Sequence, residues 1–240
     1  MITVHHLENS RSQRILWLLE ELNLEYRLQT YARDSNSMRA PKALKEIHPL
    51  GKAPIITDTT LAGENAEPVV VAESGAIIEY LIDLYAGQGS GSTAHLRPPA
   101  GSQAERDYRF WLHFAEGSAM LPLMLRLVFS RLDKPPVPYK PPVPWLVRPI
   151  ARKLAKGVND SFISPEIKAH LAYMDTCLEH RQWLAGDSLT GADIQMSFPI
   201  QALDARQGLK NHPNIQEWLA RIRQREAFQR AVAKGGELAL

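Results

Sequence analysis

The sequence has little cysteine, and this shortage excludes several classes of protein. Its 240 residues include one cysteine, Cys177, so no internal disulfide framework and no CxxC pair can form. Such usage is typical of a reducing compartment, and we expect a cytoplasmic protein. Cys177 falls on an apolar helical stripe and is interpreted as a packing residue. The eight histidines show no ligand spacing with cysteines, so we expect no structural metal.

Long apolar runs and an excess of one charge are also missing. The longest apolar stretches, such as Ile15–Leu19 and Val69–Ala72, fall far short of the roughly 20 residues that cross a bilayer. Met1 is followed directly by strand-like residues, so we expect no export signal. The 28 basic and 26 acidic side chains are scattered and form no basic stripe, which argues against nucleic acid as a partner.

Residues 2 to 85 alternate between strand and helix patterns, which predicts an α/β domain of order β-α-β-α-β-β-α. The expected strands are Ile2–Leu7, Tyr26–Tyr31, Ala53–Thr57 and Val69–Ala72, the last two forming a hairpin. Three helices are expected in this domain. The first begins near Ser10, the second spans Pro41–Ile47, and the third begins at a capping Ser74.

The second half of the chain reads as helices and loops. Glycine and serine at 87–92 indicate a linker, and helices are expected at 102–131, 165–180, 191–207 and 213–224. We therefore predict a first domain at 1–86, a linker at 87–101 and an all-helical domain at 102–240. Residues 134–149 contain seven prolines and cannot form a regular helix, so this insert is either a surface connection or a lid.

The start of the first helix is suited to binding an anion. A strand that runs into a helix near Ser10 leaves backbone N–H groups and the positive end of a helix dipole open. The Ser10 hydroxyl can donate to a thiolate bound there, and Ser12 and Arg14 follow closely. Alternatively, Ser10 or Asn9 only caps the helix, since both residue types are common caps.

The turn at Pro49–Ile55 suits a bound peptide. If the Ala53–Pro54 bond is cis, the Ala53 backbone faces outward and can pair like a sheet edge; the alternative is an ordinary trans turn. Lys52 suits a carboxylate, although a lysine in a turn is commonly only solvated.

A strand end also runs directly into a helix at Glu73 and Ser74. The first N–H groups of that helix form a second carboxylate site, and Glu73 suits an ammonium. The plain alternative is a capping serine behind an acidic residue.

Together these segments resemble the cytosolic glutathione transferases. The resemblance lies in Asn9-Ser10-Arg11-Ser12-Gln13-Arg14, in His48-Pro49-Leu50-Gly51-Lys52-Ala53-Pro54 and in Glu73-Ser74. Further along, Leu189-Thr190-Gly191-Ala192-Asp193 resembles the buried capping box of that family, whose role is in folding. The His-Pro turn and the run Trp111–Gly117 are similar to the bacterial and fungal branch. The resemblance implies an α/β thioredoxin-like domain with a mixed sheet, followed by an all-α bundle.

The resemblance also implies how glutathione lies across the first domain. Ala53 would pair with its backbone, Pro54 would follow a cis bond, and Lys52 would reach the glycine carboxylate. Glu73 and Ser74 would hold the γ-glutamyl end.

Its sulfur would lie near Ser10. Branches of the family use tyrosine, serine or cysteine at this place. No tyrosine lies near the start of the first helix and no cysteine lies in the first domain, which favours the serine type. Asn9 and Ser12 remain alternatives to Ser10.

The chemistry expected from this resemblance is control of a thiol pKa. A free thiol titrates near pH ~8.5, so little of it is nucleophilic at neutral pH. Donation from Ser10 and the helix terminus would favour the thiolate, and a shift of about two pKa units corresponds to roughly 2.7 kcal/mol. No base on the protein is then required.

The second substrate is expected to be a small hydrophobic electrophile, bound against the first long helix of the helical domain. The candidate lining residues are Tyr108, Trp111, Phe114 and Met120, with His113 and Glu116 as polar members. The predicted function is therefore glutathione conjugation, with peroxide reduction as a further use of the thiolate. The alternatives are a non-catalytic glutathione- or ligand-binding protein and a scaffold of the same fold. A homodimer is implied by resemblance.

Overall fold

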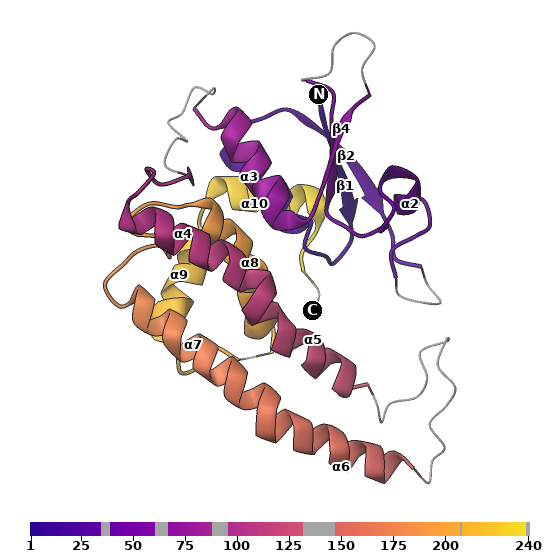
Figure 1. The fold of residues 1–240 in the computed structure, drawn as a ribbon, viewed down its shortest axis with the longest axis vertical. Coiled ribbons are helices and arrows are strands. Elements are labelled where there is room, and N and C mark those ends of the chain that lie inside the picture. The colour runs from indigo at the N-terminus through magenta and orange to yellow at the C-terminus, as the bar shows by residue number, and fades with distance from the viewer. Residues whose placement is uncertain (35–38, 61–66, 88–95, 132–146, 207, 239–240) are drawn as a thin grey trace.

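A computed structural model describes residues 1–34, 39–60, 67–87, 96–131, 147–206 and 208–238 (Figure 1). The first part holds a four-stranded mixed sheet and three helices, as the predicted thioredoxin-like domain requires. Its elements are β1 (Ile2–Leu7), α1 (Gln13–Glu21), β2 (Tyr26–Tyr31), α2 (Leu44–Ile47), β3 (Ile55–Asp58), β4 (Val69–Ala72) and α3 (Ser74–Tyr85).

The sheet has the strand order β2-β1-β3-β4. β1 and β2 are parallel, with Ile2 opposite Tyr26, because α1 carries the chain back across the sheet between them. β3 is antiparallel to both of its neighbours and pairs Ile55 with Ala72 of β4. The predicted pairing of these two strands is confirmed, while residues 61–66 of their connection lie outside the described residues.

The second part is helical. Its elements are α4 (Gln103–Phe114), η2 (Ala115–Ala119), α5 (Met120–Phe129), α6 (Arg148–Val158), η3 (Asn159–Ile163), α7 (Ser164–Leu178), α8 (Gly191–Asp204), α9 (Pro213–Arg223) and α10 (Glu226–Gly235). Figure 1 shows α8 between α4 and the first domain, and nearly all of its side chains are buried. α8 is therefore the central helix of the molecule.

The predicted capping box at the start of α8 is present. The N–H and the hydroxyl of Thr190 both donate to one carboxylate oxygen of Asp193, at 2.9 Å. The other oxygen accepts from the Leu184 N–H and from the Trp218 indole, also at 2.9 Å. Asp193 is fully buried, so these four donors replace the water that its carboxylate loses.

Two long helices contain a π-helical segment that the sequence did not reveal. The helix expected at 102–131 is α4, η2 and α5 in one run, and η2 precedes Pro122. The helix expected from 165 begins instead at Arg148, as α6, η3 and α7, and η3 precedes Pro165. A proline lacks the N–H of the helical ladder and clashes with the carbonyl four residues earlier. A wider π turn accommodates this, so a proline that predicted a helix start lies within a longer helix.

The predicted insert at 134–149 lies mostly outside the described residues. Its last residues begin α6, with Pro149 in the first turn, where the missing N–H costs nothing. The predicted linker at 87–101 is described only at Gly87 and at 96–101, where Leu96 is buried.

By length and mean hydropathy alone, the run Gln103–Phe129 would also pass as a membrane span, which was not expected from the sequence. Core helices of globular proteins pass the same test. Tyr108, Trp111 and Leu112 are buried, and α4 packs on α8, so this run is a helix of the packed domain.

The C-terminal helix α10 was not predicted, and it packs on α1 in the first domain. The Trp17 and Phe228 rings meet edge to face at 5.4 Å, and the Gln13 amide donates to the Ala231 carbonyl at 3.1 Å. Gly235 lies so close to Gln13 that a Cβ there would come within 2.4 Å of the Gln13 side chain. α1 itself begins at Gln13 and not near Ser10 as expected, because residues 10 to 12 form turns.

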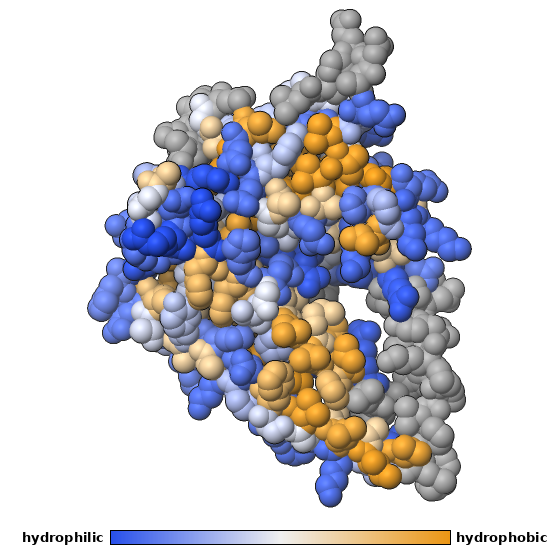
Figure 2. All heavy atoms as spheres, viewed as in Figure 1, coloured by the Kyte–Doolittle hydropathy of each residue, from blue (hydrophilic) through white to orange (hydrophobic). Residues whose placement is uncertain are grey.

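Large apolar side chains are exposed on several elements. Figure 2 shows them gathered over β4 and along α5 and α6. They include Val69 and Val70 on β4, Phe110 on α4, Leu121, Met124 and Val128 on α5, and Ile150 and Leu154 on α6.

Candidate functional site

A cavity of about 200 Å³ lies where α3 begins, and we call it the α3 cavity. Its lining residues come from the start of α1, the turn before β3, the end of β4 and η2. They are Arg11, His48, Leu50, Lys52, Ala53, Pro54, Ala72, Glu73, Ser74 and Glu116. All five residues predicted to bind glutathione (Lys52, Ala53, Pro54, Glu73 and Ser74) are in this set.

The turn before β3 is shaped by Gly51. This glycine has a φ of +56°, and a Cβ there would lie 2.5 Å from the Lys45 side chain on α2. Only glycine fits a left-handed turn pressed against a helix. The Ala53–Pro54 bond is cis, as the resemblance implied. The Ala53 N–H and C=O form no hydrogen bond with any described part of the chain, so both are open to a ligand backbone.

Glu73 has the unusual backbone of the site. Its φ of +72° is rare for a residue with a side chain, and such strain is found mainly at ligand-binding and catalytic positions. This conformation places Glu73 on the cavity wall at the end of β4 and starts α3 immediately after it.

Ser74 does not cap α3 as the sequence predicted. It is the first helical residue, and the capping position belongs to Glu73. The Ser74 hydroxyl accepts from the Gln195 amide of α8, at 3.2 Å. The first backbone N–H of α3 that donates to a carbonyl is that of Ile77, which donates to Glu73. The N–H groups before it remain available. In the described residues, the helix N-terminus is thus open toward an anion.

Five lining residues were not predicted as members of this site, and two of them, Arg11 and Glu116, form an ion pair. Arg11 was quoted only as part of a motif, and Glu116 was assigned to the second-substrate pocket. The Arg11 guanidinium donates to Glu116 at 2.9 and 3.1 Å. Glu116 also accepts from buried Arg14, which in turn donates to the Gln195 carbonyl. No local sequence signal identifies this pair, because residues 11 and 116 are 105 positions apart and meet only in the folded structure.

Burial lowers the pKa of Arg14 to about 10, although the neighbouring Glu116 carboxylate opposes this. Arg14 is therefore still cationic at neutral pH. Arg11 and Lys52 bring positive charge to the cavity lining and Glu73 and Glu116 bring negative charge, and Arg11 is paired with Glu116. The lining therefore offers both signs of charge to a zwitterionic ligand.

The three candidates for the sulfur site lie just before α1. Ser10 is 7% exposed, and its hydroxyl oxygen is 2.7 Å from that of Ser12. Ser12 is fully buried and occupies the capping position of α1 without a side-chain cap bond. Asn9 is exposed, with a φ of +51°, and its carbonyl accepts from Arg33. Neither Ser10 nor Asn9 is the cap of the helix.

The four residues predicted to bind the second substrate do not line the α3 cavity. Tyr108, Trp111 and Met120 belong to the buried core of the helical domain. Phe114 is partly buried and lines a very small apolar cleft with His170 and residues of α7 and α8. His113 is exposed.

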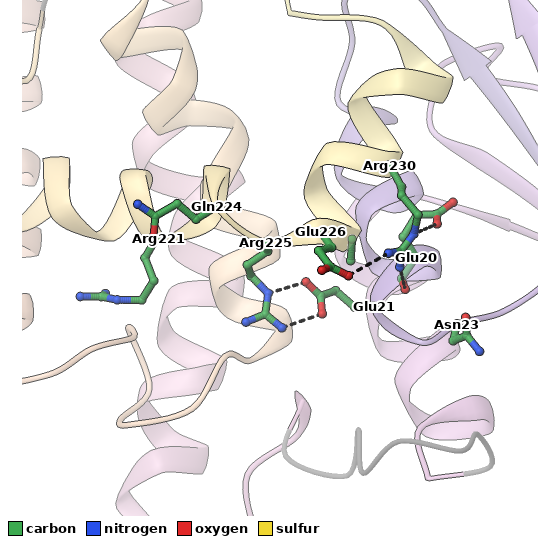
Figure 3. A pocket seen from close by; sticks show the side chains of 9 residues that line it. Glu20, Glu21, Asn23, Arg221, Gln224, Arg225, Glu226 and Arg230 are labelled. Atoms are coloured by element: carbon green, nitrogen blue, oxygen red, sulfur yellow. Dashed lines mark hydrogen bonds and ion pairs between the residues drawn. The ribbon is translucent and has the colours of Figure 1, made fainter.

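A larger hollow, of about 530 Å³, lies at the junction of α1, α9 and α10 (Figure 3). Four of its charged side chains are paired: Arg225 with Glu21 at 2.5 and 2.8 Å, and Arg230 with Glu20 at 2.8 Å. Arg221 donates instead to the Gln182 carbonyl. This hollow is a salt-bridged domain junction, and it lacks a nucleophile. Within the described ranges, no group of three or more His, Cys, Asp or Glu side chains is placed to hold a metal ion.

Comparison with known proteins agrees with this geometry. The sequence models "Glutathione S-transferase, N-terminal domain" and "Glutathione S-transferase, C-terminal domain" match residues 10–84 and 163–226. Glutathione S-transferase 1 of Saccharomyces cerevisiae is 32% identical over 241 residues, covering 99% of this chain and 97% of the yeast protein.

Solved structures extend the comparison. A glutathione S-transferase from Actinobacillus pleuropneumoniae has a TM-score of 0.75 at 30% identity, covering 100% of this chain and 95% of the other. A glutathione transferase homolog from Lodderomyces elongisporus, solved with two GSH per subunit, has a TM-score of 0.73 at 20% identity, covering 97% and 98%.

Proposed function

The chain belongs to the glutathione S-transferase family, and we propose that it conjugates glutathione to a small hydrophobic electrophile. One observation carries this proposal: five residues assigned to glutathione from sequence, spread from 52 to 74, line a single cavity beside the start of α1. A scaffold would have no use for this arrangement.

The charges of the α3 cavity match those of glutathione, which has two carboxylates, one ammonium and one thiol. Lys52 would bind the glycine carboxylate, and the open Ala53 backbone would pair with the central amide. The N-terminus of α3 at Ser74 would bind the γ-glutamyl carboxylate, and Glu73 its ammonium. We propose that the thiol then lies toward Ser10, which does not itself line the cavity but directly precedes Arg11, which does.

We assign the protein to the serine-type, bacterial and fungal branch, with Ser10 as the thiolate partner and Asn9 and Ser12 as the alternatives. A hydroxyl that donates to the sulfur, together with the start of α1, would lower the thiol pKa from its free value near ~8.5. The thiolate then attacks the electrophile, and the same thiolate would also reduce peroxides. We propose detoxification of such compounds in the cytoplasm as the role.

The electrophile would approach the sulfur from the helical domain. Of the four residues predicted for it, Phe114 alone retains appreciable accessible surface. Glu116, two residues later on η2, lines the α3 cavity. We therefore place the second substrate toward η2, outside the aromatic core.

The test combines binding and turnover. We expect retention on immobilised glutathione and conjugation of a generic aromatic halide by the wild type. Ser10→Ala should lose about tenfold or more in conjugation rate, which corresponds to about 1.4 kcal/mol of lost thiolate stabilisation. Ser161→Ala, an exposed serine on η3, is the control.

The outcomes separate the candidate functions. Binding without turnover of any electrophile would identify a non-catalytic binding protein. Absence of glutathione binding would identify a scaffold. Full activity in Ser10→Ala would overturn only the assignment of Ser10 and redirect attention to Asn9 and Ser12.

A further inference from the structure

His6 is a buried histidine that the glutathione site described above does not use. It lies on β1, is 1% exposed, and bridges two distant parts of the chain. Its Nε2 is 3.0 Å from the Gly235 carbonyl of α10, and its Nδ1 is 2.8 Å from the Ser12 hydroxyl. A carbonyl can only accept, so Nε2 carries the hydrogen of the neutral ring. Nδ1 is then an acceptor, and Ser12 donates to it.

This tautomer fixes the direction of the next hydrogen bond. Ser12 has one hydroxyl hydrogen, and the imidazole nitrogen at 2.8 Å is closer than the competing Leu7 carbonyl at 3.3 Å. The Ser12 oxygen must therefore accept in its other contacts, from the Leu7 N–H at 3.2 Å and from Ser10 at 2.7 Å. The hydrogen of the short Ser10–Ser12 contact belongs to Ser10.

The result is a directed chain of donors from Ser10 to Ser12 to His6. The Ser10 oxygen accepts the Ser12 N–H at 3.2 Å and keeps one free lone pair. A hydroxyl with its hydrogen turned inward cannot donate to a sulfur, but it can receive a proton from one. Ser10 is the outer end of the chain and precedes Arg11, which lines the α3 cavity.

We propose that His6 is the proton acceptor for the bound glutathione thiol, reached through Ser10 and Ser12. This inference rests on the proposed function. The thiol proton passes to the Ser10 oxygen as the Ser10 hydrogen passes to Ser12 and the Ser12 hydrogen passes to His6 Nδ1. The electron pair of the S–H bond stays on sulfur, so thiol and imidazole become thiolate and imidazolium without any redox change.

After this transfer the Ser10 hydroxyl points outward and donates to the thiolate. Ser10 thus donates to Ser12 before the proton transfer and to the thiolate after it. Once the sulfur has been alkylated, the imidazolium returns its proton along the same chain to water in the cavity.

The surroundings of His6 suit this role. Burial lowers the pKa of His6, so the resting ring is neutral and ready to accept, while the Gly235 carbonyl and the Glu8 carboxylate oppose that shift and would stabilise the imidazolium. The two helices packed against the ring present uncharged groups to it, Ser12 from the start of α1 and Gly235 from α10. The nearby Lys234 ammonium is bound to Glu20.

The experiment measures how many protons are released to solution for each thiolate that forms. Glutathione is added near neutral pH, thiolate is followed by its ultraviolet absorbance, and protons released to a weak buffer are measured with an indicator dye. In the wild type we expect clearly less than one proton released per thiolate formed, because His6 retains it. S-methylglutathione, which has no thiol, should bind without any proton change.

The variant His6→Asn distinguishes a histidine that accepts a proton from one that only supports the structure. An asparagine amide oxygen can accept from Ser12 near the Nδ1 position, but it cannot take up a proton. We expect this variant to bind S-methylglutathione as the wild type does, to release one proton per thiolate, and to raise the thiol pKa by about one unit, a roughly tenfold loss of thiolate. His5→Asn is the matched control, since His5 bonds to Tyr31 and Thr57 outside the chain of donors.

A structural role predicts the opposite pattern. Full proton release by the wild type, or a wild-type thiol pKa in His6→Asn, would overturn the inference while leaving the transferase proposal intact. Failure of the wild type to bind S-methylglutathione would defeat both. If His6→Asn does not fold, nitrogen-15 NMR of the wild-type histidines decides: Nδ1 of His6 must become protonated with glutathione and not with S-methylglutathione.

Discussion

Glu73 combines a strained backbone with a side chain assigned to the ligand. A substitution here should therefore affect the free energy of unfolding and the affinity for glutathione differently. Glu73→Gly relieves a conformation that costs about 1–3 kcal/mol, partly offset by the entropy of a glycine in the unfolded chain. We expect a free energy of unfolding unchanged or up to about 1 kcal/mol higher, with glutathione affinity at least about tenfold lower.

The measurements are urea unfolding and titration with glutathione. Glu73→Gln is the matched variant, because it keeps the strain and loses only the charge; its affinity should fall while its stability stays near that of the wild type. A Glu73→Gly protein that is less stable than Glu73→Gln would contradict the strain argument.

Glu116, in the second domain, forms ion pairs with two arginines of the first domain, Arg11 and Arg14. In Glu116→Ala, buried Arg14 keeps the carbonyls of Gln195 and Arg11 as partners but loses its only carboxylate among the described residues. Breaking a buried pair costs about 3–5 kcal/mol, and since Glu116 is itself 33% exposed we expect about 2 kcal/mol in the free energy of unfolding at neutral pH. Asp160→Ala, which breaks an exposed pair with Lys156, should leave the free energy of unfolding nearly unchanged. Equal effects of the two variants would show that burial of Arg14 does not matter.

At this scale the resemblance to a known family singled out five of the residues that line the α3 cavity, whereas the cap predicted at Ser74 from local sequence was wrong. The sequence could not predict Glu116 there, since the contact with Arg11 spans 105 positions and depends on how two domains meet. Nor could it predict the partners of His6, whose ring is held by residues 12 and 235.

The junction of α1 with α10 predicts an acid-sensitive element. Burial alone would raise the pKa of Glu20, but hydrogen bonds from Lys234, Tyr26 and Arg230, at 2.5 to 2.8 Å, together lower it. A carboxylate whose pKa is lowered on folding stabilises the protein fully above its unfolded pKa, near ~4.3. That stability is lost as pH falls through the lower, folded pKa.

We therefore expect the wild type to lose stability between neutral pH and pH values below about 4 more steeply than Glu20→Gln does. At neutral pH, Glu20→Gln should cost about 2 kcal/mol, because charge-assisted hydrogen bonds are replaced by neutral ones. Thermal melting as a function of pH measures both. Glu226→Gln is the control, since Glu226 is exposed and comes no closer than 4.0 Å to Arg230. An equal change of the pH profile in this control would refute the assignment to Glu20.

Among the elements, strands were predicted most closely, because alternation and β-branched runs are strong local signals. The helices at 148–158 and 226–235 were missed for different reasons. α6 follows a proline-rich segment, and none of its side chains is buried, so its position is not fixed by a local packing signal. α10 is short, and it is fixed by α1 at the other end of the chain.

For the whole molecule, the homodimer remains a prediction in which the first domain of one subunit packs on the second domain of its partner. Val70 on the edge strand β4 and Phe110 on α4 are each 43% exposed and belong to these two domains. We expect Val70→Asp and Phe110→Asp to shift dimers to monomers in light scattering after size exclusion. Ile150→Asp on α6, more exposed than either, should have no such effect. A monomeric wild type, or a dimer broken only by Ile150→Asp, would contradict this interface.

The fold class was predictable as a whole, because the switch from alternating to purely helical patterns near residue 100 is a property of composition along the chain. The mutual placement of the two halves was not, since α8 and α10 cover α1 and α3 through side chains that have no local signature. The same long-range packing produces the α3 cavity.

The docking of α10 on α1 also sets an order of events in the living cell. Gln13 and Ala231 are 218 positions apart, so a ribosome has made α1 to α9 before the helix that covers Trp17 exists. Until then the nascent first domain shows a bare apolar face to its surroundings. The apolar face of α1 around Trp17 is therefore covered only after the rest of both domains has been synthesised.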